Sequence, residues 1–181
     1  MTRPETSIVI RTFNEERDLP RLLEAIHEQR YKDFEVIDVD SGSYDRTTSI
    51  AQEYGARLLR ISSRDFTFGY SLNVGVEEAL GKFVVLVSAH TEPRDAFWLE
   101  RLIEPLRTEG VAMVYGRQFG TPKSKFGELR DLERTFGPER RVMAPPKFFA
   151  NNANSALSRE LWENHHFDEI LPGQEDIEWA K

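Results

Sequence analysis

Three features are missing from this sequence of 181 residues, and each absence excludes a class of protein. There is no cysteine, which excludes disulfides, thiolate metal sites and cysteine nucleophiles and fits a reducing compartment. No apolar run approaches the roughly 20 residues that a membrane-spanning helix needs. Positive charge is scarce, because the 24 Lys and Arg residues are outnumbered by 31 Asp and Glu residues, which gives a net charge of −7. Nucleic-acid binders depend on basic contacts to phosphates, so we expect no nucleic-acid partner.

Familiar nucleotide-binding and hydrolase motifs are missing as well. The dinucleotide fingerprint G-x-G-x-x-G does not follow the first predicted strand. The segment GVEEALGK (75–82) has the glycines and lysine of a P-loop, but it contains one intervening residue too many and precedes a strand. No G-x-S-x-G elbow is present to hold a serine nucleophile. These absences exclude the Rossmann dehydrogenases, P-loop enzymes and serine hydrolases.

What the sequence does contain is a regular alternation of strands and helices. Leu19, Leu22, Leu23 and Ile26 show the apolar spacing of a helix. Continuously apolar strands separated by such helices predict an α/β fold, in which a mostly parallel sheet carries helices on both faces. The predicted strands are SIVIRTF (7–13), FEVIDVD (34–40), ARLLRI (56–61), the run that starts at Phe83, and VAMVYG (111–116).

Short segments rich in polar residues stand where three of these strands end. The segments are Phe13–Glu15, Asp40–Ser43 and Ser88–His90. In open parallel sheets, ligands bind outside the carboxyl ends of the strands. We therefore expect these three strand ends to converge on one site.

The second half of the chain is less regular. Residues 117–149 mix charges with scattered Gly and Pro around a predicted helix at 125–136, and a connection this long is usually functional or mobile. The segment FFANNANSAL (148–157) then predicts a strand that enters a helix. In LPGQEDIEWAK (171–181), a turn precedes a helix that is still unfinished at Lys181, so we expect further residues beyond it. We expect one domain over 1–181, with a donor-binding half at 7–116 and an acceptor-side half at 117–181.

Three segments together resemble the family 2 glycosyltransferases, whose fold is called GT-A. They are IVIRTFNEE, VDSGSYDRT and FDEILPGQEDIEWA, and they stand in the order and spacing of that family. A fourth segment, SLNVGVEEALGKFVVLVSAH, resembles the block in which an Asn-x-Gly helix leads into the strand that carries an Asp-x-Asp motif. The resemblance covers residues 7–116 and 149–181. It implies an inverting transferase that moves a hexosyl or deoxyhexosyl group from a nucleoside-diphosphate sugar to a hydroxyl acceptor.

The resemblance implies a set of donor-binding residues. Phe13 would pack against the base, and the carboxylates of Glu15 and Asp40 would accept hydrogen bonds from base N–H groups and ribose hydroxyls. Ser41 stands where the family often has a second aspartate. The base is expected to be uracil or thymine, and therefore the donor a UDP- or dTDP-sugar. Neighbouring contacts are implied for Arg11 and Asn14.

Asn73 and Gly75 match the Asn-x-Gly of the family. The resemblance implies that Asn73 hydrogen-bonds near the diphosphate or to the next strand, and that Gly75 allows the backbone to approach closely. For Gly75 an equally good alternative is packing beneath the sheet.

Ser88-Ala89-His90 occupies the place of the Asp-x-Asp motif, whose aspartates hold a divalent cation against the diphosphate. Serine and histidine are poor ligands for Mg²⁺, which prefers carboxylate and water oxygens. Two possibilities stay open. His90 ligates a softer cation such as Mn²⁺, or it contacts the phosphates directly without a metal.

Inverting transfer needs a base to remove the proton of the acceptor hydroxyl. The resemblance assigns this role to Asp176, with Glu175 orienting the site or binding the acceptor. An alternative is that both carboxylates only stabilise the first turn of a helix. Further candidates for the acceptor side are Asn151, Asn152, Asn154 and Ser155.

The basic segment 117–149 suggests partners beyond the donor. It could attract an anionic, lipid-linked acceptor or a membrane surface, or it could be a solvated loop. We expect a cytoplasmic protein of cell-envelope polysaccharide or glycoconjugate synthesis, placed at the inner face of the membrane if this segment binds lipid. The alternative function is a nucleotide-sugar-binding domain with impaired catalysis. The sequence does not indicate an oligomeric state. The basic residues considered are Lys123, Lys125, Arg130, Arg140, Arg141 and Lys147.

Overall fold

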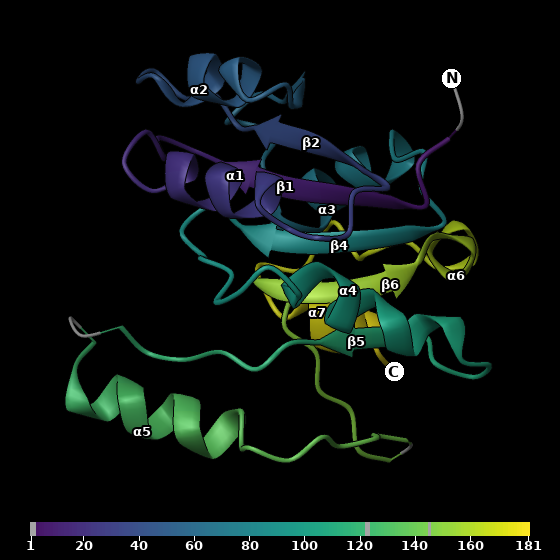
Figure 1. Cartoon of the computed structure of the whole chain (residues 1–181). Coiled ribbons are helices and arrows are strands. Elements are labelled where there is room, and N and C mark those ends of the chain that lie inside the picture. The colour runs from purple at the N-terminus through teal and green to yellow at the C-terminus, as the bar shows by residue number, and fades with distance from the viewer. Residues whose placement is uncertain (1–2, 122–123, 145) are drawn as a thin grey trace.

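A computed structural model describes residues 3–121, 124–144 and 146–181. Its centre is a six-stranded sheet of order β3-β2-β1-β4-β6-β5 (Figure 1). The first four strands of this order are parallel, and β6 runs antiparallel to both β4 and β5. The strands are β1 Thr6–Thr12, β2 Phe34–Asp40, β3 Arg57–Arg60, β4 Phe83–Ser88, β5 Met113–Tyr115 and β6 Asn154–Ser158.

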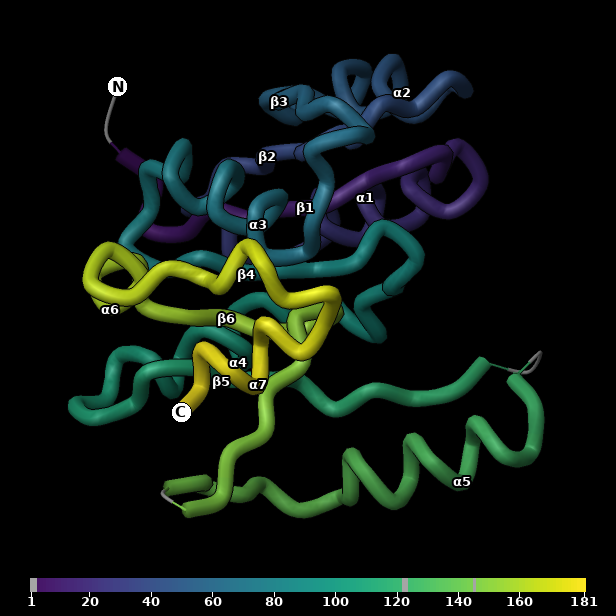
Figure 2. Tube along the Cα trace, turned by 180° about the vertical axis from the view of Figure 1, so that it is seen from behind, coloured from purple at the N-terminus to yellow at the C-terminus, as the bar shows by residue number. Residues whose placement is uncertain are grey.

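Helices cover both faces of the sheet (Figures 1 and 2). One face carries α1 (Leu19–His27), α2 (Thr47–Glu53), α4 (Trp98–Ile103) and the 3₁₀ turn η1 (Glu104–Arg107). The other face carries α3 (Phe68–Glu77), α6 (Arg159–Asn164) and α7 (Glu175–Trp179). The predicted α/β fold, with a mostly parallel sheet between two helical layers, is confirmed.

The alternation of side chains along each strand explains the two layers. In β1, Ile8 and Ile10 are buried beneath α1, whereas Val9 between them is buried beneath α3. Helix α3 approaches the sheet closely at Gly75, where an added Cβ would lie only 2.4 Å from a methyl group of Val9 and 3.0 Å from one of Val39. The structure therefore places Gly75 in the helix–sheet interface, which is the packing alternative.

The described residues 117–121, 124–144 and 146–149 form an arm that stands apart from the two layers (Figures 1 and 2). It contains α5 (Phe126–Thr135), close to the predicted helix, and no side chain of α5 is buried. Three aromatic rings fix the base of the arm to β5: Tyr115, Phe136 and Phe149 lie with ring centroids 5.0–6.1 Å apart. The arm is thus held at one end, and α5 is exposed to solvent.

The strand order places the switch point of the sheet between β1 and β4. From β1 the chain builds β2 and β3 on one side, and it then crosses to place β4 on the other side. In open α/β sheets ligands bind at this point, outside the carboxyl ends of the strands. The loops that follow β1 and β4 are therefore the first place to look for a functional site.

Candidate functional site

The loops after β1 and β2 are joined by hydrogen bonds that shape one rim of the site. Asn14 has a left-handed backbone with φ of 56°. Its backbone N–H donates to the Ser43 hydroxyl at 2.8 Å, and its side-chain oxygen accepts from the N–H of Tyr44 at 3.0 Å. The N–H of Glu15 donates to the hydroxyl of Thr47 at 2.7 Å. Asn14 therefore closes the rim, and the Glu15 side chain is left free to face the site.

Asp40 is buried at the end of β2 and folds the loop that follows it. Its carboxylate accepts hydrogen bonds from the N–H groups of Gly42 and Ser43 at 3.1–3.2 Å. Gly42 has φ of 97°, which favours glycine. Ser41 turns back to β1, where its hydroxyl donates to the carbonyl of Thr12 at 2.9 Å. The serine that stands in place of a second aspartate thus makes a bond within the protein.

Two aromatic side chains are exposed on this rim. The rings of Phe13 and Tyr44 meet edge to face with centroids 6.3 Å apart, and they are 51% and 86% exposed. Large apolar rings are usually buried, so an exposed pair at a strand end is suited to packing against a flat ligand. Tyr44 was not predicted as a site residue. Its only signal in the sequence was an aromatic residue directly after the polar Asp40–Ser43 segment.

His90 and Glu15 meet across the switch point. The His90 Nδ1 atom lies 3.5 Å from a carboxylate oxygen of Glu15, although the two residues follow different strands. Ser88, at the end of β4, is paired in register with Arg11 of β1. Among the described residues, no group of three or more His, Cys, Asp or Glu side chains could hold a metal ion. His90 and Glu15 could supply two ligands to a cation that also binds a diphosphate.

The acceptor-side carboxylates are held by the segment that leads into β6. The N–H of Asn152 donates to Asp176 at 3.2 Å, and its side-chain amide lies 3.5 Å from a carboxylate oxygen of Glu175. Glu175 is buried, whereas Asp176 is only half-buried. Asn154 behaves differently, because its side-chain oxygen accepts from the indole of Trp98 on the opposite face of the sheet. Of these asparagines, Asn152 is the one that contacts both carboxylates.

Arg11 connects the donor-side strand with these carboxylates. Its guanidinium lies over the ring of Phe68 at 5.1 Å and donates to the carbonyl of the same residue at 3.4 Å. Burial lowers the pKa of Arg11, and the nearby negative charges of Glu175 and Asp176 act in the opposite direction. The strand β1 and the helix that carries Asp176 therefore meet at one half-buried cation.

Asn73 occupies a structural position that differs from the predicted one. Its amide donates to the carbonyl of Phe167 and to the carboxylate of Glu169 at 2.8–2.9 Å. Its oxygen accepts from the indole of Trp162 and from the N–H of Phe167, both at 3.0 Å. These four bonds use the whole capacity of an amide side chain. Asn73 thus holds the segment before α7 in place and has no amide group left for a diphosphate or the next strand.

Removal of this amide should weaken the fold. We expect Asn73→Ala to lower the free energy of unfolding by about 2–3 kcal/mol, because it leaves buried donors of Trp162 and Phe167 without partners. Urea denaturation measures the change. The control is Asn164→Ala, since the Asn164 amide is exposed and, within the part of the chain that the structure describes, bonds only to the carbonyl of Glu160 in α6. Equal stability of the two variants would contradict the structural role.

Comparisons with known proteins show the family of the chain. Residues 7–165 match the family described as glycosyl transferase family 2. The chain is 31% identical over 193 aligned residues to glycosyltransferase AglE of Haloferax volcanii, with 99% of this chain and 61% of the relative covered. It is 26% identical to the GalNAc(5)-diNAcBac-PP-undecaprenol beta-1,3-glucosyltransferase of Campylobacter jejuni, with 98% and 59% covered. The chain thus spans about three fifths of the length of these two relatives.

The fold is also found in solved structures. One is the mannosyltransferase PcManGT from Pyrobaculum calidifontis in complex with GDP-Man and Mn²⁺, which superposes with a TM-score of 0.72 at 20% identity. The superposition covers 98% of this chain and 51% of the other. The likeness shows that the two proteins share a fold. From the family match over residues 7–165 and from this architecture, the chain belongs to glycosyl transferase family 2.

Proposed function

We propose that this chain is the donor-binding and catalytic part of an inverting glycosyltransferase. It would move a hexosyl or deoxyhexosyl group from a UDP- or dTDP-sugar to a hydroxyl of a lipid-linked acceptor in cell-envelope glycoconjugate synthesis. The family match supports the reaction class, and the name of the Campylobacter relative supports an acceptor carried on a lipid. The alternative, a nucleotide-sugar-binding domain with impaired catalysis, gains no support, because both relatives are named as transferases.

The observation that carries the proposal is the meeting of β1 with α7. Arg11 lies near the carboxylates of Glu175 and Asp176, and Glu15 meets His90 along the same edge of the sheet. In this proposal Phe13, Tyr44 and Asp40 bind the nucleoside, Arg11 and His90 face the diphosphate, and Glu15 binds the nucleoside when no cation is present. This division leaves Asp176 as the half-buried carboxylate on the acceptor side.

The proposed reaction is a single displacement. The acceptor oxygen attacks the anomeric carbon of the donor sugar from the face opposite the diphosphate. The bond between that carbon and the phosphate oxygen breaks, and the nucleoside diphosphate leaves with the electron pair. The proton of the acceptor hydroxyl passes to the carboxylate of Asp176. Glu175, buried between Asn152 and Arg11, orients its neighbour.

A divalent cation would neutralise charge on the departing diphosphate. His90 and Glu15 are the residues that would hold it, and the imidazole favours Mn²⁺ over Mg²⁺. Without a cation, His90 would contact the phosphates directly. The structure contains no membrane-spanning helix among the residues it describes, so we propose that any membrane association of these residues is peripheral.

The test is a thermal-shift panel of UDP-, dTDP- and GDP-sugars, each with and without Mn²⁺. We expect a UDP- or dTDP-sugar at about 100 times its Kd to stabilise the fold by about 2.7 kcal/mol. The double variant Phe13→Ala/Tyr44→Ala should bind the donor about tenfold more weakly, because it removes the aromatic pair of the rim. A shift that needs Mn²⁺ would favour the metal, and a shift without it would favour direct contact by His90.

The matched control is Phe126→Ala, which removes an exposed phenylalanine from the arm. Its donor affinity should equal that of the wild type. The absence of a shift with every nucleotide sugar would overturn the proposed function. Equal affinity of the rim variant and the control would remove Phe13 and Tyr44 from the donor site.

A further inference from the structure

The arm of residues 117–149 has a charge balance opposite to that of the remaining chain. It contains eight Lys and Arg and four Asp and Glu, which leaves 16 of the 24 basic and 27 of the 31 acidic residues elsewhere. The basic side chains that the structure describes on α5 and the following segment are exposed, and within the described residues none forms an ion pair. They are Lys125, Arg130, Arg134, Arg140, Arg141 and Lys147, whereas Lys123 lies outside the described residues.

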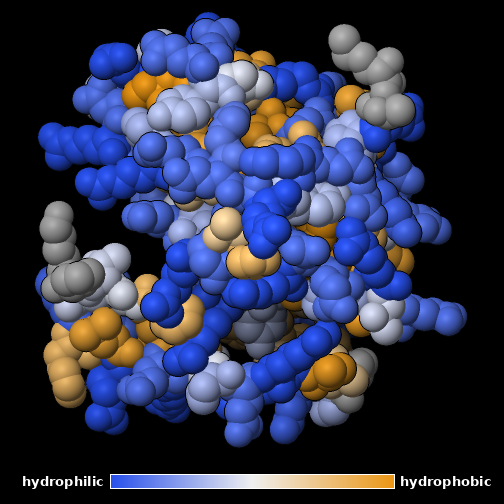
Figure 3. Space-filling view, in the orientation of Figure 1, coloured by the Kyte–Doolittle hydropathy of each residue, from blue (hydrophilic) through white to orange (hydrophobic). Residues whose placement is uncertain are grey.

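Exposed apolar side chains lie among these cations. Phe126 is 77% exposed at the start of α5, and Arg130 and Arg134 follow it at the spacing that places three residues along one ridge of a helix. The guanidinium of Arg130 lies 6.0 Å above the Phe126 ring. Beyond α5, Val142 is 91% exposed and directly follows Arg140 and Arg141. Figure 3 shows apolar side chains over the start of α5, next to hydrophilic ones.

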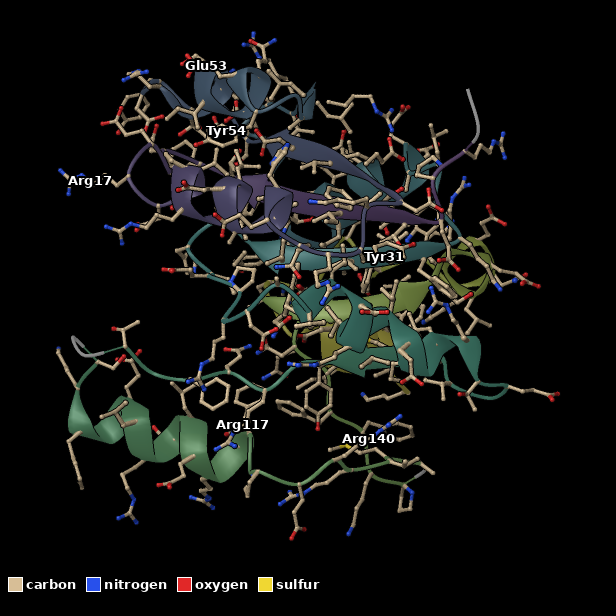
Figure 4. All side chains as sticks on the ribbon, viewed as in Figure 1. Arg17, Tyr31, Glu53, Tyr54, Arg117 and Arg140 are labelled. Atoms are coloured by element: carbon tan, nitrogen blue, oxygen red, sulfur yellow. The ribbon has the colours of Figure 1, made fainter. Side chains whose placement is uncertain are left out.

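Many charged side chains of the arm point away from the sheet. In Figure 4 nitrogen-tipped side chains extend below α5 and below the segment after it, which carries Arg140. Figures 1 and 2 agree that α5 begins on the side where the strands end. The arm therefore offers a row of cations and exposed apolar side chains that begins, at the start of α5, on the side of the candidate site and runs beneath β5 to Arg140.

We propose that this arm docks on the surface of an anionic lipid bilayer. Lys and Arg near such a surface are attracted by its negative potential, and aromatic and aliphatic side chains insert between the headgroups. Exposed Leu129 lies one turn from Phe126, and exposed Met143 follows Val142. Each small apolar group is flanked by the cations of the arm, a combination that suits a surface with both negative headgroups and an apolar interior. The acidic remainder of the chain is repelled by the same surface, so the two effects together orient the domain with its arm toward the lipid.

The consequence concerns access to the acceptor. This inference rests on the proposed function, because a transferase held in this orientation would meet a lipid-borne hydroxyl at the edge where Asp176 lies. The docking itself is measurable without any sugar transfer. Failure of the docking and failure of the proposed function can therefore be told apart.

The experiment is vesicle sedimentation of the whole chain. Vesicles of phosphatidylcholine with about 30% phosphatidylglycerol should bind the wild type, and vesicles of phosphatidylcholine alone should bind it weakly. Binding should fall as salt rises, because the surface potential is screened. Arg130→Gln/Arg134→Gln should lower the partition coefficient by about 25-fold, or about fivefold for each arginine. Phe126→Ser should lower it by about tenfold.

Two control variants make the same chemical changes elsewhere. Arg3→Gln/Lys82→Gln removes two exposed positive charges near the amino ends of the strands, and Leu80→Ser removes an exposed apolar side chain at the end of α3. Both should bind vesicles as the wild type does. Equal binding of arm variants and controls would overturn the proposal. So would a dimer that light scattering detects in the wild type and not in the arm variants, because the arm would then be an interface between copies.

The thermal shift with UDP- and dTDP-sugars is measured on the same variants. Each arm variant should keep the wild-type shift, which shows that it is folded and that its donor site is intact. If the wild type binds vesicles but shows no thermal shift with any nucleotide sugar, the docking surface is supported and the proposed transferase function is rejected. If it shows the thermal shift but does not bind vesicles, the transferase function is supported and the docking surface is rejected.

Discussion

Replacing Asp176 with Asn is expected to lower kcat by about 10²–10⁴-fold while the affinity for the donor stays unchanged. The substitution removes the group that takes the acceptor proton in the proposed reaction. It keeps an oxygen that can accept the hydrogen bond from the N–H of Asn152, so the start of α7 should stay folded. Initial rates of nucleoside diphosphate release, together with donor titration, separate the chemical step from binding.

Glu178→Gln is the matched control, because Glu178 lies in the same helix and, among the described residues, its carboxylate pairs only with His165, at 3.8 Å. It should keep kcat within about twofold, since it removes an acidic side chain of α7 without touching the acceptor side. If both variants lost activity equally, the carboxylates would serve only the stability of the helix terminus. If neither lost activity, Asp176 would not be the base.

The second large effect concerns Asp38, which lies in β2 two residues before Asp40. Its side chain is fully buried, and neither carboxylate oxygen has a hydrogen-bond partner among the described residues. Burial raises the pKa of Asp38 to about 7; the nearby Thr12 side chain opposes this rise, and the charge of Asp40 adds to it. Because the folded pKa exceeds the ordinary value of 3.8, the folded state binds the proton more tightly than the unfolded state does. Stability contributed by the neutral form is therefore lost as pH rises from about 4 to about 7.

Asp38→Asn should remove the loss of folding stability that the ionisation of Asp38 causes at higher pH. We expect the variant to be more stable than the wild type at pH 8 by about 3–4 kcal/mol and to differ little from it at pH 4. Urea denaturation at a series of pH values gives the difference in free energy of unfolding between the two proteins. Asp33→Asn, at an exposed aspartate just before the same strand, should show no such pH-dependent difference. A constant difference between Asp38→Asn and the wild type from pH 4 to 8 would contradict a buried carboxyl with a raised pKa.

The layout of the sheet was predictable from local patterns. The apolar runs at 34–40 and from Phe83 gave β2 and β4, because a strand buried on both faces has few polar positions. The stripe of Leu19, Leu22, Leu23 and Ile26 gave the buried face of α1. From these elements the rule on strand ends indicated which loops to examine, and Glu15 and His90 do lie together.

The roles of particular polar residues were much harder to predict. Asn73 belongs to a motif that implies a donor or strand contact, yet its amide bonds to residues about 90 positions later. Gly75 belongs to the same motif and serves helix packing. Arg11 was expected as a donor neighbour, but its relation to Glu175 and Asp176 was not foreseen. A sequence pattern identifies which residues are polar, and it does not identify which distant groups will satisfy them.

By itself, the sequence determined the order of strands and helices, the two helical layers and the edge of the sheet where polar residues gather. Those features follow from side-chain periodicity, which acts over a few neighbouring residues. Only the tertiary structure decided that Glu15 faces His90, that Arg11 lies near the carboxylates of α7, and that Asp38 is buried without a partner. Such pairings depend on how separate elements pack, because burial and distance between remote residues are set only when the whole chain has folded.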